Sequence, residues 1–158
     1  MKIQISAIVC ILLITLGCSK ENSAPTINSN ISYLNAKLGG CNNKSTENII
    51  QDVDKNDTVI ISLSNDTLHI LAGLNYVCCA PFITDCEIQQ DSIFINIIDT
   101  CSNPYSSCYC RCSCFYTFDF MYSGISKKKY FWQIVLSDPR EENDRVFKEG
   151  YIDVEAML

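Results

Sequence analysis

The chain has 158 residues, of which 47% are hydrophobic and 19% charged, and this balance excludes a disordered chain and suits one globular domain. Its formal net charge is −6, and the phosphates of a nucleic acid would repel such a surface. We therefore expect no nucleic-acid partner. The most unusual feature of the composition is its 11 cysteines, and how they are interpreted depends on the compartment.

The N-terminus has the pattern of an export signal. A short positive start, Met1-Lys2, precedes a mostly apolar stretch at residues 3–16, which is too short to span a bilayer. The stretch ends in Gly17-Cys18, which resembles the lipobox of bacterial lipoproteins, although Thr15 stands where that family usually has leucine. The resemblance implies that residues 1–17 are a signal peptide and that Cys18 carries lipid, including a fatty acid such as palmitate.

Residues 18–40 are polar and rich in Ser and Asn, which predicts a flexible, lipidated tether ahead of a cysteine-rich β domain at 41–158. The first residues after the lipid site, including Lys20-Glu21, resemble the signal that takes Bacteroidota lipoproteins to the outer leaflet of the outer membrane. This implies attachment to the membrane through Cys18 and exposure at the cell surface. A periplasm-facing position is the alternative.

From residue 58 onward the pattern is that of β-strands. Short apolar or alternating runs separated by turn residues predict strands at 58–63, 67–77, 82–88, 92–98, 112–122, 130–136 and 145–154. We expect Gly73 to mark a bulge, a loop at 101–109, and at most a short helix near residues 49–53. Sequential short strands predict an all-β fold, an antiparallel β-sandwich (Ig-like or a small barrel) braced by disulfides.

Nine cysteines remain once Cys10 leaves with the signal and Cys18 is lipidated, and in an exported protein they are disulfide candidates first. The candidates are Cys41, Cys78, Cys79, Cys86, Cys101, Cys108, Cys110, Cys112 and Cys114. In the run 108–114, alternate residues of an extended chain lie about 6.5–7 Å apart at Cα, so these neighbours should bond elsewhere. Adjacent Cys78 and Cys79 should face different partners, and we expect bridges between the 78–86 and 101–114 regions. The full connectivity stays open, and the odd number leaves one thiol over.

A wider resemblance rests on three parts of the sequence. These are the pair Cys78-Cys79, the run Cys108 to Cys114 with the aromatic strand after it, and the second aromatic strand from Tyr130. Over residues 75–136 the chain resembles a group of uncharacterised Bacteroidota lipoproteins, and its hairpin at 123–129 is longer than is usual in that group. The resemblance implies no activity, and no functional residue can be carried over from it.

Two classes of function remain. The first is a non-enzymatic binding or structural domain at the envelope, without a cofactor, whose ligand (a glycan or a protein) the sequence does not specify. The second is a thiol- or metal-handling protein in which the 108–114 run binds zinc or copper, since thiolates favour these ions. The run lacks the two separated cysteine pairs of a structural zinc site, so we expect no metal.

The other candidates have simple structural interpretations. His69, the only histidine, falls on the solvent side of its strand, and Asp85 and Glu87 share a solvated strand face, so we expect no catalytic residue among them. Thr58, Thr67 and Ser92 each follow an Asp and precede an aliphatic residue, which resembles the O-glycosylation pattern of Bacteroidota. The same pattern is also ordinary turn-to-strand sequence.

Overall fold

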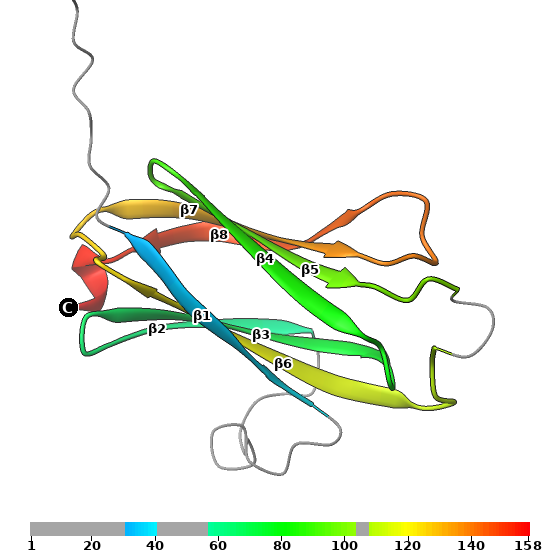
Figure 1. Ribbon diagram of the computed structural model, residues 1–158. Helices are drawn as coiled ribbons and strands as arrows, with labels where there is room; N and C mark the ends of the chain where they lie inside the picture. The colour runs from blue at the N-terminus through cyan, green and yellow to red at the C-terminus, as the bar shows by residue number, and fades with distance from the viewer. Residues whose placement is uncertain (1–30, 41–56, 104–107) are drawn as a thin grey trace, which may run out of the picture.

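The computed structural model describes residues 31–40, 57–103 and 108–158, which form two β-sheets packed face to face (Figure 1). The strands are β1 (Ser32–Gly39), β2 (Thr58–Ser64), β3 (Thr67–Val77), β4 (Phe82–Gln89), β5 (Ser92–Asp99), β6 (Ser113–Ser123), β7 (Lys129–Ser137) and β8 (Arg145–Asp153). One short 3-10 turn, η2 (Glu155–Met157), follows β8. The predicted all-β sandwich is confirmed. Within the described ranges, no helix has the length and hydropathy needed to cross a membrane.

The two sheets have the strand orders β1-β6-β3-β2 and β4-β5-β7-β8. Neighbouring strands are antiparallel except for β5 and β7, which run parallel. Prediction from successive hairpins did not anticipate this pair. Its cause is that β6, which lies between β5 and β7 in the sequence, belongs to the other sheet, so no hairpin joins β5 to β7.

The core forms where the inner faces of the sheets meet. Along β5, Ile93, Ile95 and Ile97 are almost completely buried, and along β6, Phe118 and Phe120 are fully buried. Because strand side chains alternate between faces, each of these residues points inward and its neighbours point outward. Burial of one such side chain stabilises the fold by about 1.5–3 kcal/mol relative to exposure.

Tight turns set the register of two hairpins. Between β2 and β3, Asn65 and Asp66 both have positive φ values of 48° and 60°, the conformation that a two-residue turn needs to match the twist of its strands. Between β4 and β5, Gln90 has a φ of 54°. Asn and Asp tolerate this conformation better than most residues, which accounts for the turn at Asn65 and Asp66.

The first strand corrects one prediction. Residues 32–39, which the sequence placed in the tether, form β1 and pair with β6. The pattern is hard to recognise because the register shifts between Tyr33 and Asn35 and leaves Leu34 52% exposed. The strand also lies at a sheet edge, where polar residues are common. Residues 1–30, with the signal peptide and Cys18, and residues 41–56, with the expected helix near residues 49–53, lie outside the described residues.

Gly73 corrects a second prediction, because the ladder with β6 runs past it and the ladder with β2 reaches it without a register shift, so no bulge exists there. The glycine is needed for space. A Cβ at this position would lie 2.4 Å from Cζ of Phe115, whose ring covers Gly73 from the neighbouring strand. A glycine within a strand can therefore mark a close approach of a neighbouring side chain as well as a bulge.

Candidate functional site at the cysteine-rich end

The ladder between β3 and β6 continues beyond the last strand residues into the cysteine motifs. Val77 pairs with Ser113, so the next residues, Cys78 and Cys112, lie opposite each other. The Cys78 amide donates to the Cys112 carbonyl at 2.9 Å, and the Cys110 amide donates to the Cys78 carbonyl at 2.9 Å. The backbone therefore brings the Cys-Cys pair and the Cys-x-Cys run side by side at one end of the sandwich.

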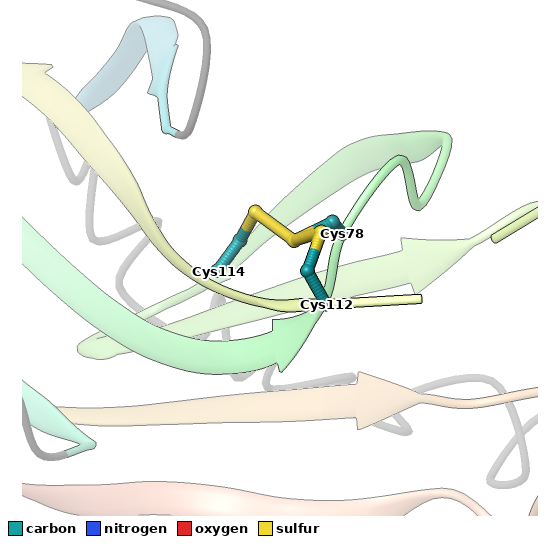
Figure 2. A group of neighbouring side chains, drawn as sticks. All are labelled: Cys78, Cys112 and Cys114. Carbon is teal, nitrogen blue, oxygen red and sulfur yellow. A yellow bond between two sulfur atoms is a disulfide. The ribbon is translucent and has the colours of Figure 1, made fainter. Parts of the chain in front are cut away.

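Three sulfur atoms converge there (Figure 2). Cys78 lies within disulfide distance of both Cys112 and Cys114, with Cα–Cα distances of 5.4 Å and 5.1 Å. One sulfur forms one disulfide at a time, so Cys112 and Cys114 are alternative partners of Cys78. Cys78 and Cys114 are buried and Cys112 is exposed. This three-sulfur cluster connects the end of β3 to the start of β6 covalently.

Two further bridges complete this end. Cys79 pairs with Cys110 at a Cα–Cα distance of 5.5 Å, and Cys101 pairs with Cys108 at 5.8 Å. Cys78 and Cys79 thus lead to different partners, as the sequence predicted. Cys79 has a φ of 67°, a left-handed conformation that is rare for a residue with a Cβ. The bridge between Cys101 and Cys108 was not expected, since both lie in the region predicted to pair with the 78–86 region.

Cys86 is the free thiol among the described cysteines, so it does not form the bridge for which it was a candidate. It lies on the inner side of β4, where the Tyr122 hydroxyl donates to its sulfur at 3.6 Å. Burial raises the pKa of Cys86, although the hydrogen bond acts in the opposite direction. A buried thiol with a raised pKa is a poor nucleophile. Cys41, the remaining candidate, lies outside the described residues.

A pocket of about 390 Å³ opens beside the sulfur cluster. Its lining has no charged side chain and consists of residues from β1, the cysteine motifs and β6: Leu38, Gly39, Gly40, Cys78, Cys79, Ala80, Cys110, Cys112, Cys114 and Tyr116. The Tyr116 hydroxyl is already engaged, because it accepts from the Ala80 amide at 3.2 Å and donates to the Val77 carbonyl at 3.3 Å. The pocket therefore offers sulfur atoms and apolar surface to its contents.

A buried carboxylate organises the same end of the molecule. Asp99, at the end of β5, is 5% exposed and accepts hydrogen bonds from the Tyr76 hydroxyl at 3.0 Å and the Tyr109 hydroxyl at 2.6 Å. It also accepts from the Cys101 amide at 2.9 Å. Burial, followed by the hydrogen bond to Asp99, raises the pKa of Tyr109 to about 12, so this hydroxyl keeps its proton. Asp99 thus connects the second sheet to β3 of the first sheet and to the cysteine-rich segment.

A second carboxylate, Asp138, lies just beyond β7 and is almost fully buried. It accepts from the Arg140 backbone amide at 2.9 Å and from Arg140 Nε at 2.8 Å. Burial alone would raise the pKa of Asp138, but these hydrogen bonds outweigh it and hold the pKa below its usual value. The Arg140 guanidinium also lies 4.5 Å from the ring centre of Tyr76 and 5.3 Å from that of Tyr109. Arginine is suited to such stacked, paired positions.

The other sequence candidates lie away from the cysteines. His69 is on the outer face of the first sheet, where its Nδ1 lies 3.1 Å from an Asp119 carboxylate oxygen. Asp85 and Glu87 are exposed on the outer face of β4, as predicted. The glycosylation candidates Thr58, Thr67 and Ser92 are the first residues of β2, β3 and β5. Their positions agree with turn-to-strand sequence, and their glycosylation stays a prediction.

The sequence interpretation missed both buried carboxylates. Asp99 could have been recognised, because it continues the inward-facing alternation of Ile93, Ile95 and Ile97. An acidic residue on the buried face of a strand needs hydrogen-bond partners. Tyr76, which lies on the buried face of β3, could have been named as one of them. Asp138 gave no such signal, since it lies in a charged loop where exposure is the usual expectation.

In comparisons with known proteins, no protein-family model, curated protein or solved structure matches the chain.

The two bridges that do not share a cysteine provide a first prediction. Cys79 and Cys110 close a loop with a sequence separation of 31, whereas Cys101 and Cys108 are separated by 7. In the double variant C79S/C110S the Cys78 bridge remains and holds nearly the same two points of the unfolded chain together, so the Cys79–Cys110 bridge closes only a small additional ring. Loop-closure entropy therefore predicts that C79S/C110S and C101S/C108S each lose about 2 kcal/mol of unfolding free energy. Urea denaturation of the oxidised proteins measures both. A loss in C79S/C110S twice that in C101S/C108S would mean that the Cys78 bridge does not close this loop in the unfolded chain.

The depressed pKa of Asp138 provides a second prediction. Its stabilising effect is complete above its unfolded pKa of about 3.9 and is lost as the pH falls through the lower folded value. Asp138→Asn should therefore be less stable than the wild type at pH 7, and the gap should narrow below about pH 4. Urea midpoints between pH 7 and pH 2 test this, with the exposed Glu142→Gln as the control. A gap that does not change with pH would contradict the assignment.

Proposed function

We propose that the protein is an envelope lipoprotein, a non-enzymatic binding or structural domain anchored to the outer membrane by lipid on Cys18 and exposed at the cell surface. The observation that carries the proposal is the disulfide-bonded end of the sandwich. Disulfides persist in exported proteins and are rare in reducing compartments, so the bridges favour the same destination as the N-terminal motif. The lipobox-like Gly17-Cys18 provides the site of lipid attachment, and the charged pair after it resembles the signal for transport to the cell surface.

The outer face of the first sheet supports a non-enzymatic role. Ser62 pairs directly with His69 across β2 and β3, and Asp119 contacts the His69 ring, so the residue types of a hydrolase triad share one face. A hydrolase also needs N–H donors aimed at the developing oxyanion. In this region the backbone N–H groups of β3 lie within the sheet, in ladders to both neighbours, and do not project from its face. The Asp119–His69 contact is therefore best explained as a surface contact between a histidine ring and a carboxylate.

The lipid anchor gives the test of this proposal. In cells expressing the full chain, Cys18→Ser should abolish incorporation of labelled palmitate and move the protein from the membrane to the soluble fraction. The control is Cys10→Ser, which changes a cysteine within the signal and should leave both properties intact. Continued palmitate labelling of the Cys18→Ser variant would refute the assignment. Labelling of intact cells with a membrane-impermeant biotin reagent then distinguishes surface exposure from a periplasm-facing position.

One observation favours the second candidate, a thiol- or metal-handling protein. The sulfur atoms of Cys78, Cys112 and Cys114 all lie within 4.8 Å of one another, close enough to share one ion if the bridges were reduced. Three thiolates would suit a soft ion such as Cu(I), whereas a structural zinc site needs a fourth ligand. This reading requires the same sulfurs to be thiolates in the cell rather than disulfides.

Counting thiols separates the two candidates. The described bridges use six of the nine mature cysteines, so we expect protein purified from membranes under non-reducing conditions to contain at most three free thiols, measured by alkylation in denaturant and mass spectrometry. The metal content of the same sample, measured by elemental analysis, should be below stoichiometric. Four or more free thiols with bound zinc or copper would overturn the structural role of the cysteines and establish metal handling.

A further inference from the structure

The outer face of the second sheet carries a row of aromatic side chains on three adjacent strands. Phe94 on β5 lies 6.1 Å from Phe131 on β7, and Phe131 lies 5.4 Å from Tyr151 on β8, measured between ring centres. Tyr151 is 76% exposed, and the two phenylalanines are half-buried. Because strand neighbours lie about 4.8 Å apart, the row is about 10 Å long.

Amides and carboxylates flank this aromatic row. One line of cross-strand pairs runs across all four strands of the sheet. It consists of Glu87, Phe94, Gln133 and Glu149, each paired with the next. The Gln133 amide donates to Glu149 at 2.8 Å, and the Gln89 amide donates to Glu87 at 2.9 Å. Each carboxylate is thus held by an amide, and each pair keeps further donor and acceptor capacity at the surface.

The row is separate from the cysteine-rich end. Phe94 lies near the start of β5, whereas Cys101 follows the end of that strand. The core also does not explain the exposure of these rings, because the inward side chains of the same strands include Ile93, Trp132 and Ile152. An exposed aromatic stripe bordered by polar groups is typical of a binding surface.

We propose that this face binds a neutral oligosaccharide, an inference that rests on the proposed function and specifies its ligand class. The C–H face of a sugar ring carries partial positive charge and packs on the negative face of an aromatic ring. Beside the row, amide N–H groups donate hydrogen bonds to the sugar oxygens, and carboxylate oxygens accept hydrogen bonds from the sugar hydroxyls. Neighbouring ring planes are inclined by 62° and 60°, so the rings do not form one flat platform, and a sugar ring stacks on one ring at a time, foremost on the exposed Tyr151. Glu87 and Glu149 disfavour an acidic glycan, because they place negative charge at both sides of the row.

Binding of full-length protein in detergent to arrayed neutral and acidic oligosaccharides tests the proposal. Calorimetry with the best neutral binder then gives the affinity. We expect binding to at least one neutral oligosaccharide, weakened about tenfold or more in Tyr151→Ala and in Phe131→Ala. Tyr151→Phe keeps the ring and should bind within about threefold of the wild type. Ile83→Ala, which changes an exposed residue elsewhere on the same sheet, should bind like the wild type.

The outcomes separate this inference from the proposed function. Emission from Trp132, the only tryptophan of the chain, checks that each variant is folded, and Tyr151→Ala keeps the test valid if Phe131→Ala unfolds. Protein that is palmitate-labelled and membrane-bound but binds no neutral oligosaccharide would overturn the sugar site alone. Three other results would also overturn it. They are sugar binding that survives both alanine variants, a preference of the protein for cationic peptides, and a wild-type protein that binds no sugar but self-associates in a way that the alanine variants lose.

Discussion

The pairing of β3 with β6 is the contact on which the rest of the structure depends. It runs from Leu68 opposite Tyr122 to Val77 opposite Ser113, and it forms the centre of the first sheet. Its inner side supplies much of the aromatic core, and its end brings the cysteine motifs together. The partners are far apart in the sequence, so forming the pair costs loop-closure entropy. The bridges at the end of the ladder offset that cost by restricting the unfolded chain.

The cysteine-rich end also unites the two sheets through polar contacts. Asp99, from the second sheet, accepts from Tyr76 of the first sheet and from Tyr109 of the cysteine-rich segment. Arg140 lies over both rings while it is paired with Asp138. Buried carboxylates are costly unless every oxygen has partners, and here they have them. Covalent and polar constraints therefore act together at one end, and the aromatic row on the second sheet lies away from both.

The sequence was sufficient for the fold class and for most strands, because the alternation of apolar residues is strong from residue 58 onward. It was insufficient for β1, whose alternation is interrupted by a register shift and whose edge position permits polar residues. The Cα spacing of an extended chain was enough to predict which regions the cysteines would pair between. The bridge between Cys101 and Cys108 depends on the shape of the loop between them, and the sequence contains no pattern that predicts this shape. The aromatic row was not visible either, because Phe94, Phe131 and Tyr151 come together only through the parallel pairing of β5 with β7.

That parallel pair has a consequence for how the domain can be handled in evolution and in engineering. The first sheet takes β1, β2, β3 and β6, and the second takes β4, β5, β7 and β8, so neither sheet is a contiguous piece of chain. A cut anywhere between β3 and β7 divides the strands of at least one sheet between the two fragments. Unlike a tandem of hairpins, the domain cannot be shortened, divided or recombined by halves. It can be moved between proteins only as one indivisible unit.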